Sequence, residues 1–548
     1  MHIIGCHGLL PAQAAAVQET ITVTLLDISA LDQDVQRLKA ALKELNSKRT
    51  ALRSFANSHK SLLSPVARLP VEVLLQIFQQ CIAVPWLVGE KTPYGSSLDK
   101  TPLMIASVNR QWRKVALSTP KLWASFNLEL RPKDMKRHVE LANMWLSRSG
   151  HSLLSIHLSS RKDFRDPMRK LMQIFASHSE RWRNIYLMLP LPLLHSLSLV
   201  KNRLANLELL QFDFCNHGNR PLLVEPIDIF AHAPRLQDFS AGVNVDRASL
   251  HIPWSQLRTI KSLSDDHSPQ SMLNLLKTAP YIERCRMKIE GNTSGPSLTP
   301  GQAPGSVQLS NLRYLTAVFE SEDPTSFFTI LDIPNIRELS LATDMGWGPL
   351  ISTLTSICSQ PSLEKLALMS MMWYDSPDVS DGLEDSDDSG DTNDTNDTDD
   401  SDDSDDSDEF NKALFRRLRG NDLMQILKAA KHVRELEVPE CNPRFFTAAF
   451  MKRFGQLRSS GTPILCPNLQ KLLFRYSEKM DLEPLGKALL SRCSSTSHPT
   501  LRDVVVLCWD AKRASITKAL QSSSWWIKLR DVGIDMRVSR FENYEQWW

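Results

Sequence analysis

Apolar residues recur with different periods along the chain, and each period predicts a different kind of structure. Between residues 19 and 60 the steps alternate between three and four, which is the spacing of a helix with a heptad seam. The seam consists of Ile21, Ile28, Leu31, Val35, Leu38, Leu42, Leu45 and Leu52. Thr24 and Arg49 interrupt it. We therefore predict a flexible N-terminus over residues 1–18 and a long helix over residues 19–62, which either pairs with a second copy as a coiled coil or packs back on its own body.

A short amphipathic helix is predicted immediately after the long one. Pro65 and Pro70 end the long helix, because proline cannot continue a helix interior. Glu72 then lies in a first turn, where the helix dipole favours negative charge. After the Leu69-Pro70 entry, Leu74, Ile77 and Phe78 fall on one face at three- and four-residue spacing, with Val71 and Leu75 alongside. One face of this helix is therefore expected to be apolar.

A partner helix is predicted about thirty residues further on. Residues 83–102 are rich in proline, glycine and serine and predict a loop. Residues 103–117 predict one helix, with an apolar face made of Met104, Val108, Trp112 and Val115. Together the two helices suggest a small all-α domain over residues 63–125.

From residue 126 onward, a short strand pattern repeats. The unit has the form x-L-x-x-L-x-Φ, where Φ is apolar, and this alternation is typical of a half-buried strand. Its first apolar residue falls at Leu153, Trp182, Leu207, Leu236, Leu257, Ile282, Leu312, Ile336, Leu363, Val433, Leu469, Leu501 and Leu529. Helical stretches such as 271–277 and 422–428 lie between the strands. Strand-plus-helix repeats at a fixed period predict a solenoid with a parallel sheet, over residues 126–374 and 410–548.

An acidic tract interrupts the repeats. Residues 375–409 contain 18 Asp and Glu and no Lys or Arg, so we expect this insertion to be disordered. The rest of the chain then has 64 basic against 44 acidic residues and carries a net positive charge. A basic body attracts acidic proteins or nucleic acid. Because no basic run is interleaved with aromatic residues in a recognisable module, nucleic acid is not the expected partner.

Residues with catalytic or metal-binding spacing are missing from the sequence. It has no phosphate-binding glycine loop, no H-E-x-x-H and no G-x-S-x-G. Nine cysteines are scattered without a C-x-x-C pair, which indicates reduced thiols in the cytoplasm or nucleus. No run approaches eighteen apolar residues, so no membrane span is expected. We therefore expect no enzyme activity, no cofactor and no metal, and we expect tryptophans near the C-terminus to cap the solenoid: Trp525, Trp526, Trp547 and Trp548.

The helical segment resembles the F-box motif. The matching residues are Leu69-Pro70-x-Glu72-x-Leu74-x-x-Ile77-Phe78, then Val108-x-Arg110-x-Trp112-Arg113, then Leu122-Trp123. With its leucine-rich helix in front of the box, the chain is most similar to the large F-box family of mushroom-forming fungi. The insertion at residues 83–102 departs from the family pattern. The strand units resemble irregular leucine-rich repeats that lack the Asn or Cys position of regular ones.

This resemblance implies an α/β protein with a long helix, an F-box-like helical module and a leucine-rich-repeat solenoid. It implies that the module docks on the Skp-type adaptor of a cullin-RING ubiquitin ligase of the SCF type, while the repeats bind a target protein. The docking residues carried over from the motif are Leu69, Pro70, Glu72, Leu74, Ile77, Phe78, Val108 and Trp112. The alternative is a non-catalytic scaffold, in which the long helix dimerises and the basic repeats bind an acidic protein or nucleic acid.

Overall fold

The computed structural model describes most of the chain in two compact units, Met1–Gln80 and Cys81–Trp548. The described residues are 11–63, 65–82, 101–160, 165–213, 226–241, 250–262, 268–290, 306–344, 347–348, 350–370, 420–438, 447–475, 482–493, 500–508 and 513–540. The predictions made for residues 1–10, most of the 83–102 loop, the acidic tract, Trp547 and Trp548 lie outside them. Each unit is described by itself.

The first unit begins with one long helix, α1 (Pro11–Leu63). The predicted flexible N-terminus therefore ends earlier than residue 18, because Pro11 suits the first position of a helix and residues 12–16 include four alanines, the best helix formers. A 3-10 turn (Pro65–Arg68) and α2 (Val71–Gln80) follow. The described side chains of α1 from Ala12 to Lys60 are all exposed, and these include every residue of the apolar seam.

α1 also meets the length and composition of a membrane span. An 18-residue window within Ala12–Lys60 has a mean hydropathy of 1.3. Alanine between the larger apolar residues raises this average, although no unbroken apolar run of that length exists. A core helix of a soluble protein and a signal sequence pass the same test, so a single helix of this kind is weak evidence for a membrane.

The second unit begins with two short helices in place of the one predicted over residues 103–117. They are α3 (Thr101–Val108) and α4 (Arg110–Leu117), so the preceding loop is also shorter than expected at its end. Asn109 separates them, because its backbone is extended (φ −156°, ψ 176°) and its side-chain oxygen accepts a hydrogen bond from the Trp112 amide at 2.8 Å. Asparagine is one of the preferred residues for such an N-cap, so the prediction of one continuous helix was wrong.

Within the described residues, fourteen strands form one sheet in which every neighbouring pair is parallel and chain order equals sheet order. The strands are β1 (Ser125–Glu129), β2 (Leu154–Ser159), β3 (Trp182–Met188), β4 (Leu209–Asp213), β5 (Asp238–Ala241), β6 (Thr259–Ser262), β7 (Arg284–Glu290), β9 (Tyr314–Glu320), β11 (Glu338–Thr343), β12 (Lys365–Ser370), β13 (Glu435–Val438), β14 (Lys471–Arg475), β15 (Asp503–Cys508) and β16 (Asp535–Arg540). β8 (Val307–Gln308) and β10 (Leu331–Asp332) form a separate two-stranded sheet.

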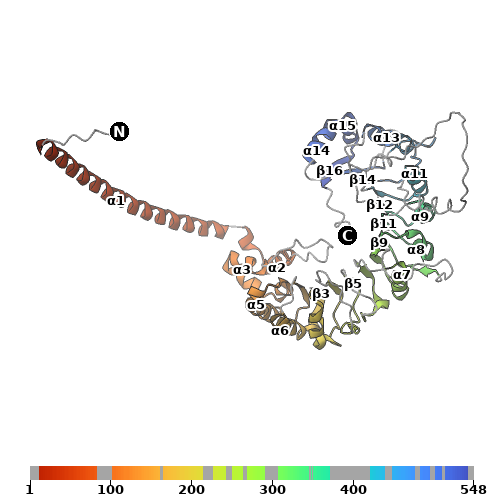
Figure 1. Cartoon of the computed structure of the whole chain (residues 1–548), viewed down its shortest axis with the longest axis horizontal. Helices are drawn as coiled ribbons and strands as arrows, with labels where there is room; N and C mark the ends of the chain where they lie inside the picture. The colour runs from red at the N-terminus through yellow and green to blue at the C-terminus, as the bar shows by residue number, and fades with distance from the viewer. Residues whose placement is uncertain are drawn as a thin grey trace, which may run out of the picture. The chain divides into compact units, whose positions relative to one another are not determined.

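Helices cover one face of the large sheet, and the strands lie on the inner side of the curve that the second unit makes in Figure 1. The remaining α-helices are α5 (Met135–Arg148), α6 (Arg165–Ala176), α7 (Pro269–Thr278), α8 (Pro324–Ile330), α9 (Leu350–Cys358), α11 (Gly420–Ala429), α12 (Ala448–Phe454), α13 (Glu483–Cys493), α14 (Arg513–Ser522) and α15 (Ser524–Asp531). The 3-10 helices are Pro120–Trp123, Pro132–Asp134, Ser179–Arg181, Leu191–Val200 and Trp254–Gln256. This is the α/β arrangement of a long helix and a large parallel sheet that the sequence predicts.

The repeat pattern locates the strands correctly except at the two ends of the sheet. Twelve of the thirteen predicted units open a strand within two residues of their first apolar position. The thirteenth prediction was wrong: Leu529 lies in α15, and the strand begins at Asp535 after a turn at Gly533 (φ 94°). β1 was not predicted. The end strands deviate because each has only one neighbouring repeat, so fewer residues are constrained to follow the pattern.

A row of side-chain hydrogen bonds joins successive repeats just before their strands, and we name it the edge ladder. In each case the side chain immediately before the first apolar residue donates to a backbone carbonyl in the preceding repeat, at 2.8 to 3.4 Å. The donors are Asn206, Asn311, Asn335, Ser362, Asn468 and Thr500. The edge ladder pairs turn carbonyls that the sheet leaves free. It was not recognised from the sequence because asparagine, serine and threonine share the position.

The core lies between the sheet and its helices. The first apolar residue of nearly every repeat is buried, and so are Trp525 and Trp526 of α15 beside the last strand. Gly486 of α13 touches the ring of Trp525 so closely that a Cβ atom at this position would lie 2.2 Å from the Trp525 Cγ. Arg492, also on α13, is buried and donates to three backbone carbonyls, those of Phe454, Leu465 and Cys466.

A buried histidine on β2 predicts a loss of stability in acid. Burial lowers the pKa of His157 to about 4, and its ring packs edge-on against Tyr186. Because the unfolded chain binds the proton near pH 6.5, the stability that neutral His157 contributes is complete above that pH and is lost as the pH falls toward 4. We expect urea unfolding to show a decrease of roughly 1.4 kcal/mol per pH unit from this group across that range.

The variant His157→Phe keeps a ring of similar shape and should flatten this part of the stability profile. Exposed His151 supplies the control, since His151→Gln should leave the acid slope as in the wild type. His138, whose pKa is lowered mainly by burial, is present in the wild type and in both variants. Its contribution to the acid slope is therefore the same in all three proteins. An unchanged slope in His157→Phe would contradict the assignment.

Candidate functional site

α2 owes its start to the prolines in front of it. The Leu69 amide donates to the Val66 carbonyl at 3.3 Å and closes the 3-10 turn, and the Leu74 amide donates to the Pro70 carbonyl at 3.1 Å as the first helical hydrogen bond. Proline at the entry leaves no amide without a partner there. Glu72 lies in the first turn, as predicted. The 3-10 turn and the hydrogen bond to the Pro70 carbonyl thus fix where this short helix begins.

The apolar residues of α2 fall into a buried pair and an exposed set. Leu74 and Phe78 are completely buried and stand one turn apart. Val73 and Ile77 also stand one turn apart but are 38% and 42% exposed, and Pro70 beside them is exposed. We name Pro70, Val73 and Ile77 the α2 docking face. The sequence analysis missed Val73, although its spacing of four from Ile77 places the two on one face.

The predicted site residues do not all belong to one unit. Leu69 is partly exposed, and Glu72 is exposed; with Pro70, Leu74, Ile77 and Phe78 they belong to the first unit. Val108 at the end of α3 is 58% exposed, Trp112 of α4 is partly exposed, and both belong to the second unit. The structure therefore brings together six of the eight residues on one turn-and-helix segment.

α3 and α4 expose apolar side chains of their own. Their outward residues are Leu103, Met104, Val108 and Leu117. On the inner side, Val115 and Ala116 are buried, and the indole nitrogen of buried Trp123 donates to the Ala116 carbonyl at 2.8 Å. This bond ties the Leu122-Trp123 ending to α4, so the exposed face is held on a rigid support.

A cluster of cations lies on the sheet face away from the helices, and we name Lys261, Arg284, Arg286 and Lys288 the basic strip. They come from β6 and β7 and alternate with buried residues such as Cys285 and Met287. Burial, followed by the neighbouring charge of Arg286, lowers the pKa of Lys261, and burial lowers the pKa of Arg286. Partly buried like charges at this spacing favour an anionic ligand.

Ion pairs bring the Lys288 end of the basic strip and the neighbouring parts of the same face closer to charge balance. Lys288 pairs with Glu320 at 2.8 Å, Lys365 with Glu437 at 3.4 Å, and Lys471 with Glu435 at 3.5 Å. The Arg284 guanidinium lies 3.7 Å from the centre of the Tyr314 ring. β6 and β7 carry four cations, Lys261, Arg284, Arg286 and Lys288, against one acidic residue, Glu290, which places the attraction for an anion at these two strands.

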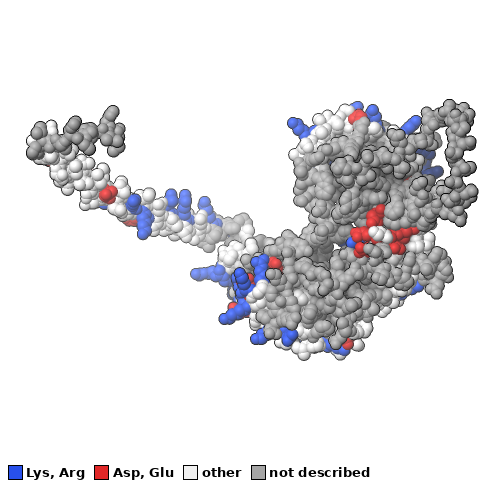
Figure 2. All heavy atoms as spheres, in the orientation of Figure 1, with Lys and Arg blue, Asp and Glu red and all other residues white. Residues whose placement is uncertain are grey.

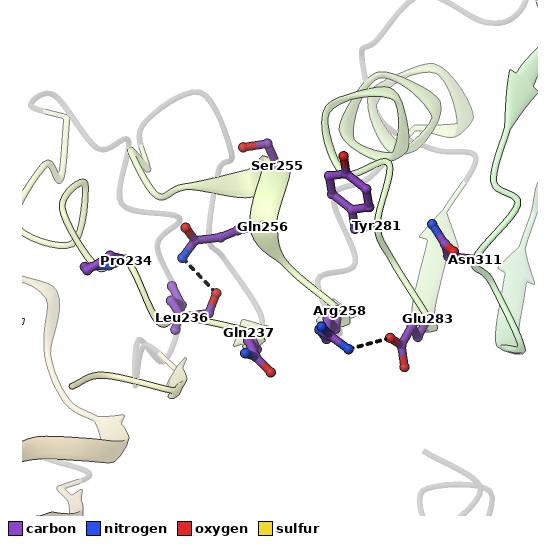
Figure 3. A pocket seen from close by; sticks show the side chains of 9 residues that line it. All are labelled: Pro234, Leu236, Gln237, Ser255, Gln256, Arg258, Tyr281, Glu283 and Asn311. Atoms are coloured by element: carbon purple, nitrogen blue, oxygen red, sulfur yellow. Dashed lines mark hydrogen bonds and ion pairs between the residues drawn. The ribbon is translucent and has the colours of Figure 1, made fainter. Parts of the chain in front are cut away.

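A hollow of about 530 Å³ lies at the edge where β5, β6 and β7 begin. Its lining includes Leu236, Gln256 and Tyr281, and Arg258 and Glu283 form an ion pair across it at 2.9 Å (Figure 3). The Gln256 amide donates to the Leu236 carbonyl at 2.9 Å in the manner of the edge ladder. Since its charged groups pair with each other, the hollow presents mainly amide groups and one exposed aromatic ring.

Groups that could support covalent or metal chemistry are sparse in the part of the chain that the structure describes. No cluster of three or more His, Cys, Asp or Glu side chains could hold a metal there. Of the six described cysteines, five are buried, and burial raises the pKa of Cys285 and of Cys466 to about 12. A thiol with such a pKa is protonated at neutral pH and is a poor nucleophile.

Comparisons with known proteins give no further assignment. No family model matches the chain. No curated protein matches it either. The functional interpretation is therefore based on the α2 docking face, the exposed residues of α3 and α4, and the basic strip.

Proposed function

We propose that this protein is an F-box-type substrate-recognition subunit of a cullin-RING ubiquitin ligase with irregular leucine-rich repeats. The observation that supports it most is the α2 docking face: an entry Leu69-Pro70 followed by a short helix that leaves Val73 and Ile77 exposed. Exposed apolar side chains on a short, fixed helix are the usual anchors of a helix-to-groove interface.

The residues of the motif take different roles in this proposal. Pro70, Val73 and Ile77 contact the Skp-type adaptor, and each contributes about 1–2 kcal/mol through buried apolar area. Leu74 and Phe78, which are buried, fix the helix. Val108, exposed in the second unit, offers a separate apolar contact, and Trp112 supports α4.

The repeats hold the target protein. The basic strip favours an acidic segment of that target, since its four cations stand close together on the open face of the sheet. The chain supplies no reacting group in this scheme. It raises the local concentration of the target next to the ubiquitin-carrying subunits, and proximity alone accelerates transfer.

Titration calorimetry with a purified Skp-type adaptor tests the proposal. The wild type should bind, and Ile77→Asp should weaken binding by at least about 100-fold, because a charge then enters an apolar contact. The matched control is Gln79→Asp, an exposed position on the opposite side of the same helix. Circular dichroism checks that both variants remain folded. Failure of the wild type to bind, or equal binding by Ile77→Asp, would sink the proposal.

The basic strip supports one alternative, a scaffold that binds acidic partners without a ligase. Under this alternative the adaptor does not bind, while an acidic protein or nucleic acid binds with a steep dependence on salt. Charge reversal with Lys261→Glu and Arg286→Glu should then abolish binding. Under the ligase proposal the same two changes should leave adaptor binding unchanged, so one pair of variants separates the two functions.

A further inference from the structure

α1 exposes more apolar surface than a single helix in water can retain. Its seam follows heptad positions a and d, and even its least exposed member, Val35, is 43% exposed. The a positions are Ile21, Ile28, Val35 and Leu42, and the d positions are Leu31, Leu38, Leu45 and Leu52. Among parallel coiled coils, β-branched residues at a with leucine at d favour two helices over three or four. That composition suggests that two helices pair. Whether they run parallel or antiparallel depends on their charges.

The two halves of α1 carry opposite charge. Its first half, residues 11–36, has four acidic residues and no Lys or Arg, whereas residues 37–63 have seven basic residues and one acidic residue. Figure 2 shows the basic side chains along the C-terminal half of α1. In a parallel pair, each half of the helix would lie against a half of the same charge. In an antiparallel pair, the acidic half of one helix lies against the basic half of the other. Charge therefore favours the antiparallel direction.

The two residues that interrupt the seam also favour an antiparallel pair, and they define how the two helices align. Thr24 occupies a d position and Arg49 an a position. In an antiparallel coil a positions face d positions, and a twofold axis between Gln36 and Arg37 makes Thr24 face Arg49 of the other copy. The remaining seam pairs are then all apolar: Ile21 with Leu52, Ile28 with Leu45, Leu31 with Leu42, and Val35 with Leu38. A parallel pair in register would instead bury Arg49 against Arg49.

The flanking e and g positions agree with this register. In the antiparallel pair, Asp27 at g lies beside Lys48 of the other copy, and Asp32 at e lies beside Lys39. A parallel pair would set Asp27 beside Asp32 and Lys48 beside Arg53, with Asp34 beside Lys39 as its one attractive contact. The antiparallel pair has two attractive contacts and neither of the two repulsive ones, and e and g charges help to set the orientation of coiled coils. The twofold axis also falls at the middle of α1 (Pro11–Leu63), so the two helices overlap along their whole length.

We propose that α1 pairs with α1 of a second copy of this chain as an antiparallel two-stranded coiled coil centred between Gln36 and Arg37. The pairing uses residues outside the α2 docking face and the basic strip, so it does not depend on the proposed ligase function. Because the helix has 53 residues, the two copies of α2 would be held about 80 Å apart.

Disulfide trapping in the full-length chain tests the direction. In a background with Cys6, Cys81, Cys215 and Cys441 changed to serine, the remaining five cysteines are buried. One chain carries Thr24→Cys, and a second chain with a different tag carries Arg49→Cys. After mixing and mild oxidation, the antiparallel pair should give only the disulfide between the two variants. A disulfide between two copies of Arg49→Cys would show a parallel pair and overturn the proposal.

Sedimentation velocity tests whether the pair forms at all. The wild type should sediment as a dimer, and Leu31→Lys, on the seam, should weaken dimerisation by at least about 100-fold. Leu26→Lys is the matched control, because Leu26 is as exposed as Leu31 (66% against 65%) but lies off the seam. A monomeric wild type overturns the proposal, and so does a monomer that floats with phosphatidylcholine vesicles, since α1 would then act as a membrane segment.

Discussion

Replacing Gly486 with alanine is expected to lower the opening free energy of the α13–α15 region by about 2–4 kcal/mol, measured by hydrogen exchange of its amides. In an ordinary helix interior the same change stabilises by about 1 kcal/mol, so the sign itself is diagnostic. The reason is the contact with Trp525, whose Cγ would lie 2.2 Å and whose Cβ would lie 2.8 Å from the new methyl carbon. The Trp525 Cβ is fixed to the backbone of α15, so a change of side-chain rotamer cannot relieve the overlap.

The background Trp525→Ala provides the control for this prediction. This change costs stability by itself, because it leaves a cavity under α15. Within that background, however, Gly486→Ala should no longer destabilise, and its helix propensity should make it neutral or slightly favourable. An equal loss in both backgrounds would show that the close approach is not what requires glycine at this position.

Replacing Arg492 with methionine is expected to cost about 3–5 kcal/mol in the same region. The guanidinium donates at 2.7 to 3.0 Å to the carbonyls of Phe454, Leu465 and Cys466, which belong to the end of α12 and the segment before β14. Methionine fills similar space but donates no hydrogen bond, so the Phe454 and Leu465 carbonyls lose the guanidinium as a donor, and the Cys466 carbonyl keeps only the Leu469 amide at 3.2 Å. Burial lowers the pKa of Arg492 to about 10, so the side chain remains protonated at neutral pH.

Two further variants sharpen this prediction. Lys487→Met removes an exposed cation from the same helix and should leave hydrogen exchange unchanged. Arg492→Lys keeps a positive charge but not the planar fork that reaches three carbonyls, so its loss should lie between wild type and Arg492→Met. If Arg492→Met were as stable as Lys487→Met, the three hydrogen bonds would contribute nothing net to the fold.

The repeat architecture could be predicted from the sequence because one physical requirement recurs. Each strand must bury its alternate residues between two neighbouring repeats, so the x-L-x-x-L-x-Φ pattern is imposed many times over. Local effects were less visible. Asn109 resembles any polar surface residue until its side chain is seen to accept the Trp112 amide, and the turn at Gly533 shifted the last strand away from Leu529.

The sequence predicted which segment forms the candidate site, but not which of its side chains are exposed. Helical spacing placed Leu74, Ile77 and Phe78 on one broad face, and the structure divides that face into a buried part and an exposed part. Val73 joins the exposed part because it lies one turn before Ile77. The division depends on what packs against the helix, which periodicity alone does not contain. The basic strip was equally hidden, since Lys261 and Arg286 become neighbours only when β6 and β7 pair.

The direct pairing of β12 with β13 has a consequence for how this protein tolerates changes in length. Lys365 and Leu366 are in register with Glu435 and Leu436, and the amides of Arg434 and Glu435 both donate to the Glu364 carbonyl. The sheet therefore continues from β12 to β13 as it does between strands joined by short connections. Because the entropy of closing a flexible loop rises by only about 0.6 kcal/mol per doubling of its length, this junction is a permissive one. Whole domains, reporters or regulatory segments can be exchanged there while the repeats on either side keep their partners.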